Sequence, residues 1–394
     1  MTHRARRTLL AASIALLLGN LIAQAGRGIW NIAAGGAPDF VGFAAAARLL
    51  AHGSRCLYCA LPLAQAAAQY VGHTGPVPAV DPFLNPPPAA LVLVPLVALP
   101  KLWGFAIFIA LSAASLVAAG WLLIRRLSCP PMPTLLALAA IPSGLALVDG
   151  QWAPLLTLAL VASLCLVRRR PMAAGMLLAL LLIKPQTIWL VPLALIAARR
   201  WRVLSGLCLG AVAGAALSVA LVGVHETLAW ASAVEGAGSV WLAGSSSVPG
   251  FAASIAGTSA GYVAAAAGAG TALTAAILLR HQLQAEPELA IATFCSLSLC
   301  LSPHVGGADL CLLAPSLALA GRRVPRLAVA AALVLSAAFL SDLSYVNPDT
   351  VPGFLGVAAA AAIGVVGLSL DHGWARQSRN SSPAGRRASA VVAP

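Results

Sequence analysis

The stretch that decides the fold is residues 171–198, PMAAGMLLALLLIKPQTIWLVPLALIAA, a largely apolar run in which Lys184 is the one charged residue. Arginine clusters flank it at 168–170 and 199–202. Arginines mark the cytoplasmic side of a membrane protein, so both ends are expected on one side. Each half is shorter than the ~20 residues of a spanning helix, and Pro185 ends a helix. The sequence therefore predicts a short hairpin that turns at Lys184 near the outer membrane surface.

The composition of the whole chain agrees with a membrane protein. Hydrophobic residues make up 60% of the chain, charged residues only 9%, and the mean hydropathy is +0.91. A soluble domain needs more polar surface than this. The net charge of +13 comes mostly from arginines at the ends of apolar segments rather than along one polar face. We therefore predict an all-α polytopic membrane protein that does not bind nucleic acid.

Apolar length and flanking charge predict about twelve spans in a single transmembrane domain, residues 1–370, with both termini in the cytoplasm. A full crossing at residues 86–100 would place Arg125 and Arg168 outside. This segment is therefore expected to be re-entrant or strongly tilted, or else one arginine pair departs from the positive-inside rule. Residues 371–394 are polar and predict a disordered cytoplasmic tail. The expected spans after the first are 102–124, 132–148, 152–167, 172–183, 187–198, 203–223, 258–279, 289–302, 308–321, 327–341 and 353–370.

The first apolar stretch, Thr8 to Ala25, comes after the basic sequence MTHRARR. It reads either as a retained first span or as a signal peptide cleaved after a small-x-small pattern at 23–25. Both interpretations export the next segment of the chain, so residues 26–86 are expected to form a large outer loop. A second outer loop is expected at about 224–257, as a mobile lid or as a simple connection.

Polar groups lie near the middle of three successive arginine-bounded intervals. They are the turn Asp149-Gly150-Gln151-Trp152, Lys184, and the turn Ser302-Pro303-His304. Their positions predict three hairpin tips on one outer face, as in the floor of a site. A lysine at the centre of a bilayer costs roughly 2.5–3.5 kcal/mol, so Lys184 is expected to face a cavity or an anion. The alternative is that its amine snorkels to the interface.

Asp39 is one of few acidic residues in the first outer loop, and it precedes an apolar helical run. One interpretation is an N-cap, since Asp accepts the free amides at a helix start. The other is a general base at the membrane surface, and the two roles are compatible.

Cys56 and Cys59 form a C-x-x-C pair in the same loop. The pair is open to three interpretations: a small disulfide, two free thiols, or half of a metal site. A second ligand pair is missing from the loop, so a metal is not expected.

The order of several motifs resembles glycosyltransferase family 87, the polyprenyl-phosphate-mannose-dependent mannosyltransferases of the GT-C superfamily. The resemblance covers roughly residues 8–321. It departs from the family at Asn85, where an aromatic residue is usual, and at Cys59, where an acidic residue often follows LY. The acceptor and the sugar specificity therefore stay open. The motifs, in order, are PDF…AARLLAHG…LY, NPPPAALVLVPLVALP, DGQW, RRPMAAGMLLALLLIKPQ and SPH.

The resemblance implies a GT-C-type bundle of about twelve transmembrane helices with a large first periplasmic loop, in the inner membrane of the cell envelope. It implies an inverting hexosyltransferase that moves a sugar, mannose by the family's bias, from a polyprenyl-phosphate donor to a lipid or glycan acceptor. Membrane lipids are the other expected partners, and no cofactor is expected. Asp39 is the expected catalytic base. The expected donor-phosphate ligands are Lys184, His304 and Gln151, and the candidate substrate contacts are Gln186, Asn85, Tyr58 and Arg55.

Two alternatives remain at this level. A secondary transporter also buries ionisable residues, but duplicated halves are not evident in this sequence. An outer-leaflet polysaccharide polymerase or ligase is expected to carry several arginines outside to hold pyrophosphate. This chain offers only Arg27, Arg48 and Arg55 there.

Overall fold

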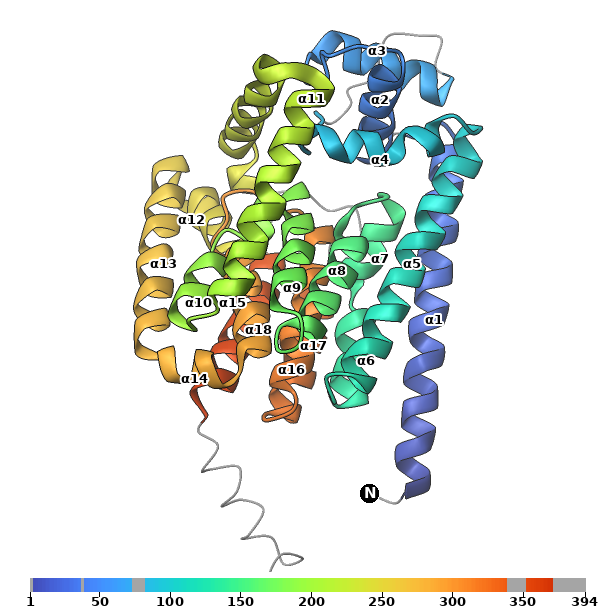
Figure 1. The fold of residues 1–394 in the computed structure, drawn as a ribbon. Helices are drawn as coiled ribbons and strands as arrows, with labels where there is room; N and C mark the ends of the chain where they lie inside the picture. Colours follow the sequence, from blue (N-terminus) through green and yellow to red (C-terminus); the bar gives the residue numbers. More distant parts are fainter. Residues whose placement is uncertain (1–2, 37–38, 73–81, 339–351, 371–394) are drawn as a thin grey trace, which may run out of the picture.

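A computed structural model describes residues 3–36, 39–72, 82–338 and 352–370, and these residues form helices and connections without any β-strand (Figure 1). The expected all-helical fold is confirmed for them. The predicted tail at 371–394 lies outside the described residues. The α-helices are α1 (His3–Ala33), α2 (Asp39–Ala51), α3 (Ala60–Val71), α4 (Pro87–Val97), α5 (Lys101–Arg125), α6 (Pro131–Ala139), α7 (Ile141–Val148), α8 (Ala153–Leu166), α9 (Pro171–Leu178), α10 (Val191–Ala197), α11 (Trp201–Val240), α12 (Val248–Ala256), α13 (Thr258–Leu278), α14 (Arg280–Ala285), α15 (Pro287–Cys300), α16 (Ala314–Ala320), α17 (Pro325–Ala338) and α18 (Pro352–Ser369). The 3-10 helices are η1 (Ala179–Ile183), η2 (Pro185–Thr187), η3 (Leu242–Gly244) and η4 (Gly307–Leu313).

Three of the described helices, α5, α11 and α13, are long and apolar enough to cross a membrane. The bent pair α6 and α7 makes a fourth if it counts as one span. Other apolar helices are shorter; α8 and α15, for example, have 14 residues each. Large apolar side chains such as Trp121 on α5 and Val263 on α13 are exposed, as lipid-facing residues are. The total of about twelve spans stays a prediction.

Helix α4 lies across the upper end of the molecule rather than along its long axis (Figure 1). It begins after Pro86 and has 11 residues, about 16 Å at the rise of an α-helix. The hydrocarbon core of a bilayer is about 30 Å thick. Helix α4 is therefore too short to cross the hydrocarbon core by itself, and the re-entrant or tilted course of residues 86–100 stays a prediction.

Helical structure replaces much of the expected outer loops. Helix α1 continues to Ala33, and the first loop contains α2 and α3. In the second expected loop, α11 runs on to Val240 after a bend at Gly223, whose φ of +87° suits glycine. Helix α12 fills most of the remainder. The backbone leaves the helical conformation at Gly223 and resumes it at once, so much of 224–257 is helical. Its role as a lid or a connection stays a prediction.

Close packing of α9 on α11 fixes the helix that leads to Lys184. A Cβ atom on Gly175 would lie 2.0 Å from the carbonyl oxygen of Val203, and one on Gly206 would lie 2.2 Å from that of Met172. Only glycine fits at both contacts, and small residues at such crossings are typical of membrane helices. The two glycines therefore set the position of the first half of the apolar hairpin.

Arginines from three hairpins converge on one connection, residues 284–288, at the lower end of the molecule in Figure 1. Arg168 binds both carboxylate oxygens of Glu288, at 2.6 and 2.9 Å. Arg200 donates to the carbonyl of Gln284, and Arg323 lies 3.2 Å from the carboxylate of Glu286. These clusters therefore share one end, as the arginine pattern predicted. That this end faces the cytoplasm stays a prediction.

Candidate active site

The upper end is built around the start of α2, where Asp39 is the first residue of the helix. The next side chain, Phe40, is fully buried. Its ring centroid lies 5.1 Å from those of Phe105 and Phe108 on α5 and 6.4 Å from that of Tyr70 on α3. This aromatic contact holds the first turn of α2 against α5, so the half-buried carboxyl group of Asp39 is placed by its neighbour in the sequence.

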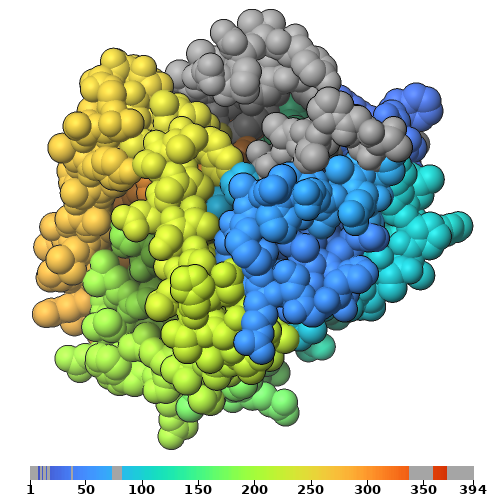
Figure 2. Space-filling view, turned by 90° about the horizontal axis from the view of Figure 1, so that it is seen from above, coloured from blue at the N-terminus to red at the C-terminus, as the bar shows by residue number. Residues whose placement is uncertain are grey.

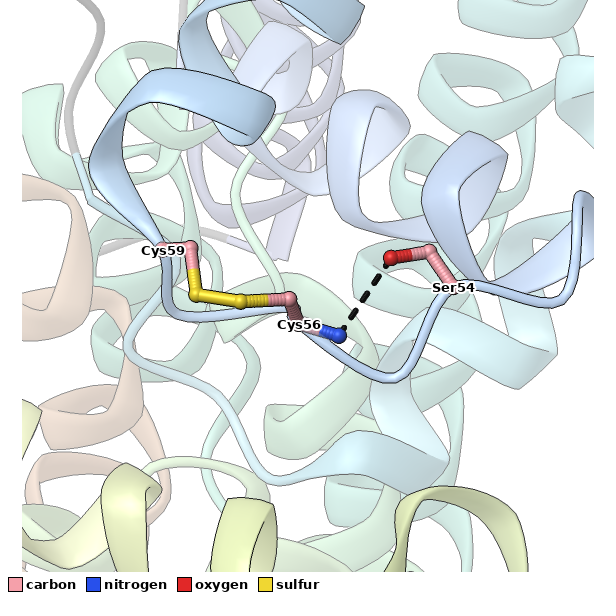
Figure 3. Close-up of a disulfide and its surroundings, with 3 residues drawn as sticks. All are labelled: Ser54, Cys56 and Cys59. Atoms are coloured by element: carbon pink, nitrogen blue, oxygen red, sulfur yellow. Dashed lines mark hydrogen bonds between the residues drawn. A yellow bond between two sulfur atoms is a disulfide. The ribbon is translucent and has the colours of Figure 1, made fainter.

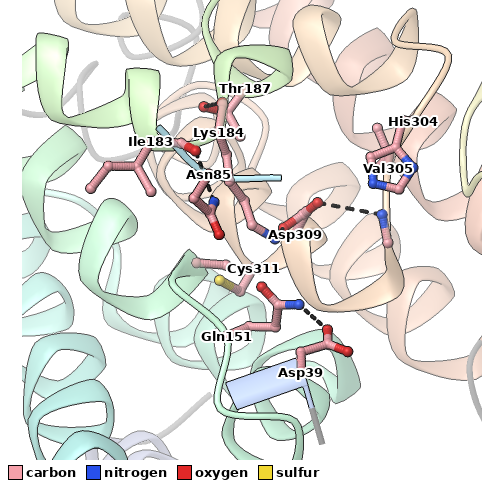
Figure 4. Close-up of polar contacts among 12 residues, drawn as sticks. Asp39, Asn85, Gln151, Ile183, Lys184, Thr187, His304, Val305, Asp309 and Cys311 are labelled. Atoms are coloured by element: carbon pink, nitrogen blue, oxygen red, sulfur yellow. Dashed lines mark hydrogen bonds and ion pairs between the residues drawn. The ribbon is translucent and has the colours of Figure 1, made fainter. Parts of the chain in front are cut away.

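The DGQW turn packs directly against that first turn. The amide of Phe40 donates to the carbonyl of Asp149 at 3.0 Å. Gly150 has a φ of +66°, and a Cβ there would lie 2.7 Å from the Cβ of Phe40. The turn presents Gln151, 8% exposed, whose Nε2 donates a hydrogen bond to the Asp39 carboxylate (Figure 4). One of the two N–H donors of this amide is thus engaged by Asp39. Its expected contact with the donor phosphate stays a prediction.

The predicted break at Lys184 is present. Helix α9 tightens into η1, the backbone of Lys184 leaves the helical region with φ −128° and ψ 83°, and Pro185 begins η2. Proline lacks an N–H group and disfavours a helical conformation in the residue before it, which explains the break. The Thr187 hydroxyl donates to the carbonyl of Lys184 at 2.8 Å and closes the turn.

The amine of Lys184 lies 2.5 Å from the carboxylate of Asp309, a pairing that was not predicted (Figure 4). Both residues are buried, with exposures of 9% and 1%, so the lysine does not snorkel. The second carboxylate oxygen of Asp309 accepts the amide of Gly306 at 3.3 Å. The sequence did carry a signal, because Asp309 is a lone acid in an apolar stretch, and such a residue needs a partner.

His304 was expected beside Lys184, but its ring packs against Trp241, with centroids 5.1 Å apart. Figure 4 shows this ring to one side of the Lys184–Asp309 pair. The neighbouring residue, Val305, is tied to the start of α12: its amide donates to Ser245 at 2.8 Å, and its carbonyl accepts the amide of Ser246 at 2.9 Å. His304 therefore borders the site on the α11–α12 side.

Two expected substrate contacts are engaged inside the protein. The hydroxyl of Tyr58 donates to the carbonyl of Asn85 at 2.8 Å, and the buried side chain of Asn85 donates to the carbonyl of Ile183 at 2.9 Å. Arg55 is exposed, and Gln186 is half-buried in η2. Tyr58 thus contacts Asn85, and Asn85 contacts the residue before Lys184. Contacts of Tyr58 and Asn85 with a substrate stay a prediction.

Cys56 and Cys59 are joined by a disulfide in the connection between α2 and α3 (Figure 3). The amide of Cys56 donates to the hydroxyl of Ser54 at 3.3 Å. A carboxylate oxygen of Glu226 on α11 and the two sulfurs all lie within 4.8 Å of one another. The thiolate is the form of cysteine that binds a metal, and the two cysteines lack it while they are joined as a disulfide. Among the three interpretations of the pair, the structure has the disulfide.

Helix α11 packs beside the first outer segment at this end of the molecule. Seen from above, the blue surface of α2 and α3 lies beside the yellow-green surface of α11 (Figure 2). The indole of Trp230 on α11 donates to the carbonyl of Leu84 at 2.8 Å. Trp230, Glu226 and Trp241 were not singled out in the sequence, because nothing in its local pattern shows that α11 bends back over this end.

Comparison with known proteins gives a family for the chain. The family model described as glycosyltransferase family 87 matches residues 83–303, which is more than half of the sequence. The match includes Gln151 and Lys184 and ends just before His304. No curated protein and no solved structure matches the chain.

Proposed function

Because this chain belongs to glycosyltransferase family 87 and is therefore a glycosyltransferase, we propose that it transfers a hexose from a polyprenyl-phosphate-linked donor. Mannose is the first sugar to test. The acceptor is a hydroxyl group of a lipid or glycan on the outer face of the cytoplasmic membrane. A transporter does not agree with the family, so the remaining alternative is the polymerase or ligase reaction.

One observation carries the proposal: a held carboxylate and a buried amine belong to the same end of the molecule (Figure 4). Asp39 comes directly after the outer connection that leaves α1, and Lys184 lies at the break of an apolar hairpin. A lipid-linked donor places its phosphate at membrane depth and its sugar above it. We therefore assign the amine to the phosphate and the carboxylate to the acceptor.

The reaction is an inverting displacement. Asp39 takes the proton of the acceptor hydroxyl as the acceptor oxygen forms a bond to the anomeric carbon of the sugar. The bond from that carbon to the phosphate oxygen breaks, and polyprenyl phosphate leaves as an anion. A stable anion needs no general acid. Gln151 keeps the Asp39 carboxylate in place, and its buried Oε1, which has no hydrogen-bond partner among the described residues, suits a sugar hydroxyl.

Lys184 stabilises the leaving phosphate. An ammonium group has three N–H donors, and the structure gives Lys184 one partner, Asp309, among the described residues. The remaining N–H donors suit phosphate oxygens. The contact with Asp309 fixes the position of the amine that carries them. Positive charge placed in advance where negative charge develops is the usual source of such stabilisation.

The test uses purified protein in lipid nanodiscs with radiolabelled polyprenyl-phosphate mannose, polyprenyl-phosphate glucose and a nucleotide-linked mannose. A lipid extract of the host membrane supplies the acceptor. We expect label to appear in a new lipid or glycan product, and only from the polyprenyl-phosphate donors. Because the proposed reaction uses no metal, transfer should continue in the presence of EDTA. Transfer from the nucleotide sugar alone would overturn the donor proposal. A regular ladder of products would favour the polymerase alternative.

A further inference from the structure

A short segment, Leu84-Asn85, ties three parts of the upper end together. The carbonyl of Leu84 accepts the indole N–H of Trp230, and the carbonyl of Asn85 accepts the hydroxyl of Tyr58, each at 2.8 Å. The side chain of Asn85 donates to the carbonyl of Ile183 at 2.9 Å. Asn85 is 3% exposed, so its own side-chain amide is shielded from water. The segment therefore joins the first outer connection and α11 to the residue before Lys184.

The bond to Ile183 bears on the position of Lys184. Ile183 ends η1, and the backbone leaves the helical region at the next residue. A carbonyl at such a break has no following helical turn to supply its N–H partner. The Asn85 amide supplies that partner and so fixes the peptide group from which Lys184 begins. Figure 4 shows the Asn85 side chain beside Lys184.

Tyr58 is held in turn by the disulfide, because it lies inside the four-residue ring that Cys56 and Cys59 close. Leu57 in the same ring is fully buried, and the Tyr58 ring stacks on Phe83 with centroids 5.7 Å apart. Burial, with a smaller contribution from the nearby Glu226 carboxylate, raises the pKa of Tyr58 above its ordinary value. The phenol therefore keeps its proton and stays a donor throughout the neutral pH range.

We propose that Tyr58 and Asn85 are positioning residues for Lys184, and that the Cys56–Cys59 disulfide maintains this positioning. The inference rests on the proposed function, in which Lys184 binds the donor phosphate. Reduction by a dithiol converts the disulfide into two thiols and the dithiol into its own disulfide. It frees the ring that holds Tyr58, so Lys184 is held less firmly and donor binding weakens. Oxidation of the pair outside the cell thus makes the enzyme fully competent.

The first test compares Tyr58→Phe with Tyr70→Phe. Both tyrosines donate to a backbone carbonyl on the same end, Tyr58 to Asn85 and Tyr70 to Lys101, but only the first contact leads to Lys184. A hydrogen bond of this kind is worth about two- to tenfold in an equilibrium. We expect Tyr58→Phe to raise the KM for the lipid donor by about that factor, with kcat and Tm near the wild-type values. Tyr70→Phe should leave that KM unchanged.

The second test removes the side-chain amide itself. Asn85→Leu deletes the donor to Ile183, and Asn20→Leu deletes a comparable amide-to-carbonyl bond between α1 and Ala139. We expect Asn85→Leu to raise the donor KM more than Tyr58→Phe does, and Asn20→Leu to leave it unchanged. If the two leucine variants changed the donor KM equally, Asn85 would act only on stability, and the inference would be overturned.

The third test is chemical. Dithiothreitol should raise the donor KM of the wild-type protein to the value of the Cys56→Ser/Cys59→Ser variant, which itself should not respond. An unchanged KM after reduction, verified by thiol labelling, would remove the disulfide from the account. If the wild-type protein uses no polyprenyl-phosphate donor at all, the proposed function fails. If it does use one and all these variants match their controls, the positioning inference alone fails.

Discussion

The two ends of the molecule both hold ion pairs, and the pairs differ in kind. At the lower end, the guanidinium of Arg168 binds Glu288 through two hydrogen bonds, and the two side chains are 52% and 9% exposed. At the upper end, Lys184 meets Asp309 through one short contact, and the two side chains are 11% and 2% exposed. The first pair joins helices where water can reach it. The second pair is enclosed in the protein.

This difference separates structural charge from functional charge. Arginine suits the lower end, because its planar fork matches a carboxylate and its contact also reaches the backbone of Ala285. A buried lysine with one partner is expensive for stability and keeps donors for another anion. We therefore expect variants of the upper end to change transfer, and variants of the lower end to change stability alone.

The largest effect is expected at Asp39. Asp39→Asn keeps the size of the side chain and its place at the start of α2, but an amide cannot take the acceptor proton. Loss of general-base assistance typically lowers a rate by ~100- to 10,000-fold. We expect kcat to fall by that factor, with donor binding and Tm retained, measured with the radiolabelled lipid donor.

The matched control for that variant is Glu235→Gln, because Glu235 is an exposed carboxylate on α11 of the same expected outer region. It should transfer sugar at the wild-type rate. A well-folded Asp39→Asn protein that keeps most of its activity would remove Asp39 from the mechanism, and loss of activity in Glu235→Gln would point to that residue as the base.

The second effect is expected at Lys184. Lys184→Met fills a similar volume but leaves the Asp309 carboxylate buried without its cation. Removing one partner of a buried pair typically costs about 3–5 kcal/mol. We expect a clear fall in Tm in detergent or nanodiscs, together with loss of saturable donor use. A normal Tm for this variant would contradict this expectation. It would show that the Asp309 carboxylate is stabilised by water or by another group once Lys184 is removed.

The third effect concerns the turn that positions Asp39. Gly150→Ala places a Cβ 2.7 Å from Phe40 in a backbone conformation with φ +66°. Overpacking typically costs about 1–3 kcal/mol, and the left-handed conformation adds to it. We expect a lower Tm and a fall in kcat, because the turn that carries Gln151 must move away from α2. Gly53→Ala is the control, since Gly53 has a similar φ of +75° and open space around it. It should lower Tm less and leave kcat unchanged.

The smallest effect is expected at the lower end. Arg168→Met removes the two hydrogen bonds to Glu288, but the arginine side chain is half exposed, so solvent screens the pair. We expect a loss of about 1 kcal/mol in stability and no change in donor KM or kcat. A change in either kinetic constant would contradict the separation between the two ends.

The sequence predicted most of the helices and the break at Lys184, because apolar length, proline and arginine act locally. The ends of α5, α13 and α18 agree closely with the expected spans. The expected span 203–223 ends where α11 breaks at Gly223, but the helical part that continues from there to Val240 was not predicted. The crosswise position of α4 was anticipated from charge, but its exact place depends on packing.

The site was predicted less completely than the fold. The sequence singled out Asp39, Gln151, Lys184 and Asn85, and the structure places them at one end. It did not show which of them bind each other. The Lys184–Asp309 contact joins residues 125 positions apart, and composition carries no information on such a pairing. Nor did the sequence show that the side-chain amide of Gln151 donates a hydrogen bond to Asp39.

The most direct test of the difference between the ends removes one whole ion pair from each. The two variants are Lys184→Met/Asp309→Asn and Arg168→Met/Glu288→Gln, both free of unpaired buried charge, assayed for transfer from the radiolabelled polyprenyl-phosphate sugar. Our account predicts that the first folds but no longer shows saturable donor use, and that the second keeps the wild-type KM and kcat. Equal loss of transfer in both variants, or normal donor use in the first, would contradict it.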